Sequence, residues 1–322
     1  MQKFLITSRK LLFQIGSLLG LVLLSIQIYQ TMVGLKNQSI SLQSIWPILL
    51  AIIVVVGSLF QQVEVWMILM RSSGASLPRS KALYGYMISF LARYIPGTIW
   101  GYISRSEWLW QTYQIAYAKS NYISILEIIF AILGCLVTIG LGTIVTDKPF
   151  ISTWTGYLLI LLPVVFWLFL SSKLASYLSK SISSSQQNSA AHSNLSIKNW
   201  FVILILLILN WFYYGLGLFF VGLAFGAWDI FQLPKIWMDL TISFSLSWLT
   251  GFIVVFIPSG LGLRELVLSS LLIYHFSISG HLAQGISITM RLTTTLAEII
   301  CIAIAIVLYR YSPNGVSTKS AE

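Results

Sequence analysis

Seven long apolar runs constrain this chain more than any other feature. Each comes near or exceeds the ~20 residues that an α-helix needs to cross the hydrocarbon of a bilayer. The runs are Leu11–Tyr29, Ile45–Met70, Tyr122–Val145, Thr153–Leu170, Trp200–Phe225, Ile236–Ile257 and Ala283–Tyr309. Only 9% of the residues are charged, whereas soluble domains carry about 25%. We therefore exclude a soluble enzyme and predict an all-α, polytopic integral membrane protein.

The first run raises the alternative of a cleaved signal peptide. A signal peptide has a shorter apolar core and a small-residue cleavage site after it. Here Leu11–Tyr29 is followed by larger residues, so we expect a retained helix.

Lys and Arg residues predict the orientation of the chain. With the N-terminus in the cytoplasm, eleven basic residues fall in cytoplasmic segments and three fall outside, as the positive-inside rule requires. The three outer residues are Lys36, Lys148 and Lys235. This balance requires the interrupted segment Ala82–Trp110 to be re-entrant and the short run Leu263–Phe276 to cross. We predict eight crossings plus one re-entrant hairpin, with both termini inside.

Only two segments have an aqueous composition. Residues 171–198 are rich in Ser and predict a polar cytoplasmic loop, and residues 312–322 predict a cytoplasmic tail. Neither is large enough for a second domain, so we expect residues 1–322 to form a single membrane domain.

The net charge of +10 and the two cysteines exclude further classes. The basic residues form short clusters between apolar runs, a pattern typical of loops that face anionic lipid rather than of a nucleic-acid surface. Cys135 and Cys301 lie inside apolar runs, where a free thiol behaves as a small hydrophobe. We therefore expect no disulfide, no metal site and no cofactor.

Ionisable residues within or at the ends of the runs are the first candidates for a site. Each costs about 2.5–3.5 kcal/mol at mid-bilayer and usually pairs or lines a wet cavity. They are Glu64, Glu127, Arg264, Glu265, Arg291 and Glu298. In the last run, Arg291 and Glu298 share one polar helix face, which predicts either a structural ion pair or a cavity that receives a charged headgroup. Ser, Thr and Gly on such faces have the simpler interpretation of close helix packing.

Two Pro-Gly breaks interrupt the apolar pattern. The first, Arg93–Trp100, contains Pro96 and Gly97. The second, Ile257–Glu265, contains Pro258, Gly260 and Gly262. Broken helices in a membrane line cavities or are buried in protein. Glycines before a helix start, with Arg264 one turn in, predict a phosphate site; the alternative is two ordinary proline kinks.

These segments resemble the flippase-like transmembrane family named after the membrane domain of lysylphosphatidylglycerol synthase. The resemblance covers nearly the whole chain and is most specific at Arg93–Trp100, Pro258–Glu265 and Arg291–Glu298, with Glu127 at a matching acidic position. Ser259 and Thr98 depart from the family's usual Gly and Lys. The resemblance implies an eight-helix domain in the cell membrane, of the bacterial plasma membrane type, that binds or moves lipids. In the aminoacylating members a soluble synthase domain follows this membrane domain, and we expect this chain to lack it.

We therefore expect a lipid flippase-like protein and no enzymatic activity. Its partners would be membrane lipids with an anionic headgroup or a lipid-linked phosphate. The predicted substrate-binding residues are Arg93, Pro96, Gly97, Glu127, Pro258, Gly260, Gly262, Arg264, Glu265, Arg291 and Glu298. Two alternatives stay open: a membrane-embedded lipid or glycolipid transferase, and a non-transporting partner in a lipid-pathway complex.

Overall fold

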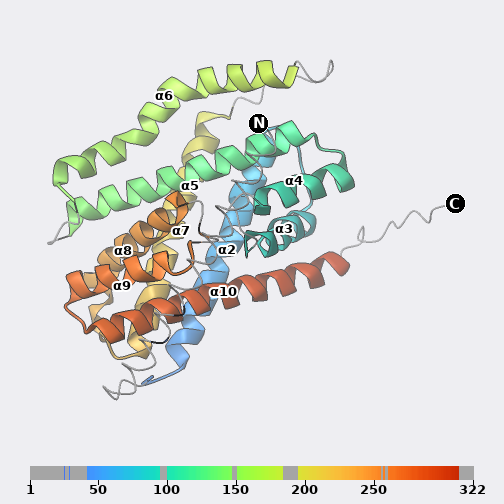
Figure 1. The fold of residues 1–322 in the computed structure, drawn as a ribbon. Coiled ribbons are helices and arrows are strands. Elements are labelled where there is room, and N and C mark those ends of the chain that lie inside the picture. The colour runs from blue at the N-terminus through green and yellow to red at the C-terminus, as the bar shows by residue number, and fades with distance from the viewer. Residues whose placement is uncertain are drawn as a thin grey trace, which may run out of the picture.

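The computed structural model shows a bundle of helices (Figure 1). It describes residues 25, 29, 42–94, 100–146, 151–183, 195–254, 257 and 260–311, without the side chains of 93, 94 and 169–183. No strand occurs within these ranges. The predicted all-α class is confirmed.

Five described helices are long and apolar enough to cross a membrane. They are α2 (Trp46–Ser72), α5 (Tyr117–Val145), α7 (Ile197–Ala224), the unit of η2 (Ile230–Gln232) and α8 (Leu233–Ile253), and α10 (Gly280–Arg310). A helix pairs its own backbone N–H and C=O groups, as hydrocarbon demands, and the runs of these helices contain few charged side chains. The multi-pass prediction is confirmed at this level.

The remaining predicted crossings either have shorter apolar stretches than these five helices or lie outside the described residues. Helix α6 (Thr153–Ser183) contains a shorter apolar stretch, Thr153–Leu168. Helix α9 (Leu263–Phe276) has the predicted bounds, and its 14 residues cover about 21 Å at 1.5 Å per residue, less than the ~30 Å of hydrocarbon. The run Leu11–Tyr29 lies outside the described residues except for positions 25 and 29. The count of eight crossings stays a prediction.

The predicted loop over residues 171–198 was too long. Helix α6 continues to Ser183 before the chain leaves the described range. Residues 171–183 contain neither Gly nor Pro, and their Leu, Ala and Lys residues favour helix. The Ser-rich composition suggested a loop, but no residue there stops a helix that is already propagating.

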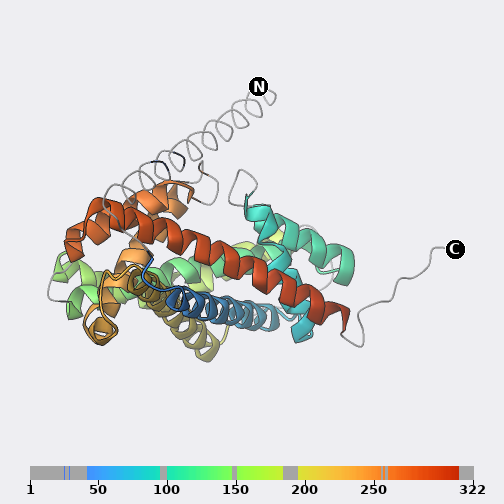
Figure 2. The same cartoon turned by 90° about the horizontal axis from the view of Figure 1, so that it is seen from below.

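Five elements close into a ring. Helix α2 packs against α7 and α10, and α8 and α9 complete the circle between those two. Helix α10 crosses α2 in the view of Figure 1, and Figure 2 shows the two helices next to each other. Helix α5 packs across α7 and α8, and α6 covers the outer side of α5. A β-carbon at Gly215 would overlap Thr241, and one at Gly142 would overlap Ile242, so small residues do permit close helix packing here.

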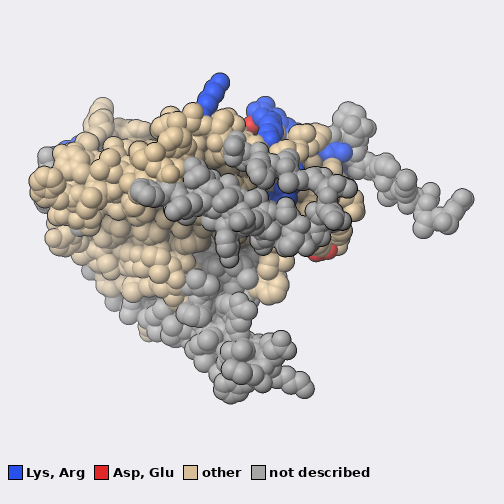
Figure 3. Space-filling model, turned by 90° about the horizontal axis from the view of Figure 1, so that it is seen from above, with Lys and Arg blue, Asp and Glu red and all other residues tan. Residues whose placement is uncertain are grey.

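Basic side chains gather where several helix ends meet. Helix α2 ends beside the start of α7, where Asn199 Nδ2 donates to Ser72 Oγ over 3.2 Å. Tyr84 of α3 (Arg79–Ile88) stacks on Tyr309 near the end of α10, with ring centroids 4.2 Å apart. The basic residues on these ends are Arg71, Arg79, Lys81, Lys119, Lys198 and Arg310. In Figure 3, Lys and Arg are concentrated on part of the visible face, and the rest of its coloured surface is mainly uncharged.

The interrupted segment forms a hairpin at this basic end. It consists of α3 (Arg79–Ile88), η1 (Leu91–Tyr94) and α4 (Trp100–Tyr113). The ammonium of Lys81, at the start of α3, lies 5.7 Å from the ring of Tyr113, the last residue of α4. Both outer ends of the hairpin therefore lie at the same end of the bundle, as a re-entrant segment requires; the re-entrant assignment itself stays a prediction.

We expect cysteine labelling of intact cells to separate the two ends of the bundle. Lys235→Cys, at the start of α8, should react with an impermeant maleimide from outside. Lys198→Cys at the start of α7 and Gln111→Cys at the end of α4 should react only after permeabilisation. Cys135 and Cys301 are buried and should stay silent. Labelling of Gln111→Cys from outside, with Lys198→Cys protected, would show that the hairpin crosses.

Candidate functional site

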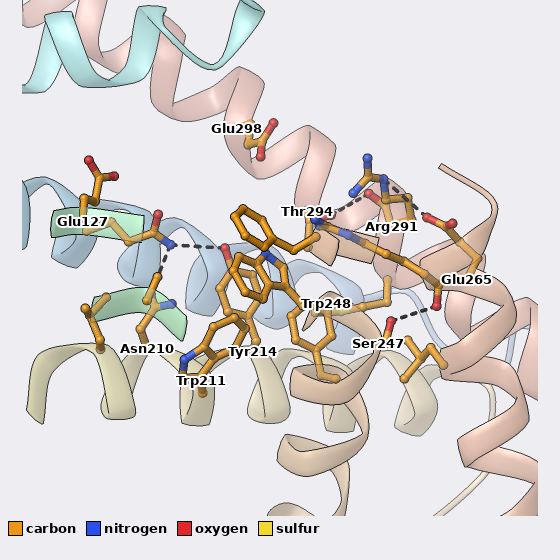
Figure 4. A pocket seen from close by; sticks show the side chains of 18 of the residues that line it. Glu127, Asn210, Trp211, Tyr214, Ser247, Trp248, Glu265, Arg291, Thr294 and Glu298 are labelled. Carbon is orange, nitrogen blue, oxygen red and sulfur yellow. Dashed lines mark hydrogen bonds and ion pairs between the residues drawn. The ribbon is translucent and has the colours of Figure 1, made fainter. Parts of the chain in front are cut away.

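A cavity of about 180 Å³ lies inside the bundle. Helices α2, α5, α7, α8, α9 and α10 form most of its wall, and the α3–α4 hairpin adds Tyr86 and Tyr102. Five of the predicted site residues line it together: Glu127, Arg264, Glu265, Arg291 and Glu298. Figure 4 shows Glu127 at one side, Arg291 and Glu265 at the other, and Glu298 on α10 between them in this view.

Arg291 is paired across two helices. Its Nε lies 3.5 Å from Oε1 of Glu265, a residue of α9 that is only 3% exposed. For Arg291 and Glu298 the sequence left open a structural ion pair or a cavity that receives a headgroup. Both residues line the cavity, and the ion pair that the described structure shows for Arg291 is the one with Glu265.

Two serines fix the first turn of α9 from neighbouring helices. Ser247 of α8 donates to the carbonyl of Arg264 over 2.8 Å, and Ser287 of α10 donates to the carbonyl of Glu265 over 2.9 Å. Figure 4 shows Ser247 beside this turn. Because both bonds hold backbone atoms, the side chains of Arg264 and Glu265 start from defined positions at the cavity wall.

Glycines make room for the side chain of Arg264. Its guanidinium lies 5.7 Å from the ring centre of Trp248, within the range of a cation–π contact. A β-carbon at Gly251 would overlap the Arg264 side chain, and one at Gly260 would lie 2.8 Å from its Nε. Both glycines therefore bring the chain close to the arginine.

The two glycines of the second break give the backbone its predicted freedom, but one of them accommodates a side chain instead of leaving the backbone open. Gly260 and Gly262 have φ of +67° and +79°, a region that disfavours other residues. We predicted that both glycines leave the backbone bare for phosphate. The space beside Gly260 is instead filled by the Arg264 side chain, so Arg264 is the group offered to the cavity. Pro258 lies outside the described residues.

A second charged pair joins Arg105 to Glu127, which lines the cavity on the side away from Glu265. Arg105 of α4 is 1% exposed, and its Nη2 donates to Oε2 of Glu127 over 2.5 Å. The Tyr86 hydroxyl donates to Oε1 of Glu127 over 2.8 Å. The guanidinium of Arg105 is surrounded by the rings of Trp66, Tyr86 and Tyr102, 5.1, 4.8 and 5.3 Å from their centres. This contact ties the hairpin to α5.

Polar contacts extend from this pair across the bundle. Oε1 of Gln62, on α2, lies 3.3 Å from the Tyr86 hydroxyl. Nε2 of the same side chain lies 3.2 Å from Oδ1 of Asn210 and 3.5 Å from the Tyr214 hydroxyl, both on α7 (Figure 4). These side chains give one wall of the cavity a continuous polar lining.

Of the other predicted residues, Gly260 and Gly262 are not among those that line the cavity, and the rest lie outside the described residues or side chains. Pro96 and Gly97 lie outside the described residues, and so does the side chain of Arg93 in η1. Glu64 pairs with Arg79 over 2.8 Å, near the basic end.

Sequence reasoning missed Arg105 and Asn210 as site residues. Arg105 lies in an apolar but interrupted segment, where its charge could have been matched with Glu127. Asn210 is the only amide in the run Trp200–Phe225, which is a usable signal because polar groups are costly in hydrocarbon. The partners of both depend on helix contacts that are distant in sequence.

Comparisons with known proteins add no assignment. No family model, no curated protein and no solved structure matches the chain. The resemblance to the flippase-like family therefore stays a prediction. Within the described residues, no group of three or more His, Cys, Asp or Glu side chains could hold a metal ion.

We expect Arg105→Ala to destabilise the protein strongly. The change leaves Glu127 buried without its counter-charge, which costs about 3–5 kcal/mol. The matched control is Arg79→Ala, because the Arg79 side chain is 77% exposed in its pair with Glu64 and such pairs contribute below about 1 kcal/mol. Thermal unfolding in detergent, followed by gel filtration, measures both variants.

A double variant completes the test. Arg105→Leu with Glu127→Leu removes both charges and should recover part of the lost stability. Equal unfolding temperatures for Arg105→Ala and Arg79→Ala would contradict the buried pair.

Proposed function

We propose that this protein is a flippase-like membrane protein that binds a phosphate-bearing lipid and moves its headgroup through the cavity. The observation that carries the proposal is the cavity of about 180 Å³ with Arg264, Arg291, Glu127, Glu265 and Glu298 in its wall. It lies among helices long and apolar enough to cross a membrane. The proposed location is the cell membrane.

The cost of the buried charges supports a functional role. Each charge at mid-bilayer costs about 2.5–3.5 kcal/mol on insertion scales. Apolar residues of similar size often replace a buried ion pair with no loss of stability. A bundle selected only for stability therefore has little reason to place five ionisable residues around one cavity.

The two arginines are the groups suited to phosphate. A guanidinium offers several N–H donors in one plane, which match the oxygens of a phosphate. Nε of Arg264 is buried and has no hydrogen-bond partner among the described residues. Arg264 and Arg291 both line the cavity, so a phosphate there would meet two guanidinium groups.

The cavity is large enough for a small headgroup but too small for the hydrophobic chains of a lipid. A volume of about 180 Å³ suits a small headgroup, and drug-sized ligands usually occupy larger pockets, about 300–1,000 Å³. The hydrophobic chains would therefore remain in the bilayer. Large apolar side chains on the outer faces of the bundle, such as Leu158, Leu161 and Ile205, are 65, 55 and 54% exposed and suit contact with lipid chains.

We expect Arg264→Ala to reduce lipid translocation in proteoliposomes at least about tenfold, the effect of losing about 1.4 kcal/mol of interaction. Arg264→Lys should be intermediate, because lysine keeps the charge but lacks the planar fork. Gly251→Ala should also reduce transport by displacing Arg264. Its control is Gly57→Ala, because a β-carbon at Gly57 meets nothing within 4 Å.

Folding is checked for each variant by gel filtration, and retained lipid is measured by mass spectrometry. The proposal fails if wild-type protein neither retains nor moves any phosphate-bearing lipid. It also fails if all Arg264 variants fold and transport at the wild-type rate.

A further inference from the structure

Helices α5 and α10 line the same cavity without packing extensively against each other. Glu127 and Ala131 come from α5, and Arg291, Thr294 and Glu298 come from α10. Within the described residues, neither α4 nor α5 packs extensively against α9 or α10. The wall of the cavity therefore has no helix–helix interface along the line between α5 and α10.

Packed helices close this line at both of its ends. At one end, α8 packs against α5 and α9, and Ser287 of α10 donates to the carbonyl of Glu265 of α9. At the other end, α3 packs against α10, where Tyr84 stacks on Tyr309. In Figure 1, α5 and α10 lie on opposite sides of the bundle, with α8 and α9 to the left and α3 and α4 to the right. The interruption is thus confined to the middle of α10.

On this middle part of α10, the cavity-lining face passes directly into the outer face. Leu292, Leu296 and Ile299 form an outer stripe and are 63, 45 and 55% exposed. Because successive residues lie about 100° apart around a helix, Thr295 falls between that stripe and the cavity-lining Arg291. Thr295 is half-buried, whereas a helix packed over this side of α10 would bury it.

The middle of α5 shows the same transition. Ala131 lines the cavity, and Ile128 and Ile132, which follow it around the helix, are half-buried. Farther around, Ile125 is 43% exposed. These side chains are apolar, so they suit contact with hydrocarbon rather than with water.

We call this interrupted part of the wall the lateral mouth. It consists of Ile128, Ala131 and Ile132 on α5 and Leu292, Thr295 and Leu296 on α10.

The lateral mouth lies halfway along a helix that is long and apolar enough to cross a membrane. Thr295 is equally far in sequence from Gly280 and from Arg310, the two ends of α10, so it lies about 22 Å from either end. The hydrocarbon of a bilayer is about 30 Å thick. In the proposed membrane placement, the lateral mouth therefore faces hydrocarbon and lies far from both aqueous phases.

We infer that the cavity opens sideways into the bilayer through the lateral mouth, and that the hydrophobic chain of a bound lipid leaves the cavity there. This inference rests on the proposed function and names the route by which its ligand reaches the site. The headgroup would occupy the cavity while the chain extends between α5 and α10 into the surrounding lipid. The ligand is then an amphiphile, because a water-soluble phosphate compound avoids hydrocarbon and would need an aqueous entrance.

The first experiment measures what surrounds the lateral mouth. A nitroxide is attached to Thr295→Cys in liposomes, and its relaxation is measured with oxygen, which concentrates in hydrocarbon, and with a water-soluble nickel chelate. We expect oxygen to relax the nitroxide more strongly than nickel does. Leu158→Cys, at a position 65% exposed on α6, should behave in the same way. Lys235→Cys, at an exposed position at the start of α8, should show the opposite order.

The second experiment obstructs the lateral mouth. Thr295→Trp places an indole in the path of the chain and should slow lipid translocation at least about tenfold, which corresponds to about 1.4 kcal/mol. The matched control is Ala303→Trp, because Ala303 is an exposed residue of α10 outside the lateral mouth; its rate should equal that of wild type. The assay uses proteoliposomes of phosphatidylethanolamine and phosphatidylglycerol, each labelled in turn on an acyl chain with a dithionite-quenchable fluorophore.

The outcomes separate this inference from the proposed function. Stronger relaxation by nickel than by oxygen at Thr295→Cys would show an aqueous entrance, which overturns the lateral mouth and leaves lipid transport standing. A folded Thr295→Trp protein that moves lipid at the wild-type rate, or an equal loss in Ala303→Trp, overturns it as well. If Thr295→Trp does not fold, the nitroxide measurement decides by itself. If wild-type protein neither binds nor moves any phosphate-bearing lipid, the proposed function fails, and the passage of a lipid chain through the lateral mouth fails with it.

Discussion

Ionised side chains inside a bilayer need counter-charges, and the interior of this bundle is arranged around that requirement. The pair of Arg105 and Glu127 shows it most clearly, because Arg105 is 1% exposed and its Nη2 lies 2.5 Å from the Glu127 carboxylate. Without the pair, either residue would face the full cost of an isolated buried charge. The contact also joins the α3–α4 hairpin to α5, so placement of the hairpin depends on electrostatics as well as on packing.

The same requirement shapes the other side of the cavity. Helix α9 starts inside the bundle, where Ser247 and Ser287 hold its first carbonyls. Glu265 and Arg291 then meet across α9 and α10, and Gly251 and Gly260 leave space for Arg264. Two polar clusters thus face one another across a cavity among apolar helices. In the proposed function, a charged headgroup would reside between these clusters while its chains remain in lipid.

Much of the fold could be predicted from apolar run length, because a helix that crosses hydrocarbon must satisfy its own backbone groups. The bounds of α9 and the approximate positions of α2, α5, α7 and α10 follow from that rule. The end of α6 could not be predicted in this way, because serine-rich composition does not by itself stop a helix. Five of the predicted site residues line one cavity, since polar residues in apolar runs tend to face one another.

The sequence by itself determined that the chain is a helical, multi-pass membrane protein with charges buried among its spans. Run length and the scarcity of charge are sufficient for this, because both act locally along the chain. Only the tertiary structure decided which charge meets which. Arg291 pairs with Glu265 of α9, and Arg105 of α4 reaches Glu127 of α5, because helix packing brings different segments together at distances of a few ångströms. Ion pairs depend on that separation, and no periodicity within one helix reports it.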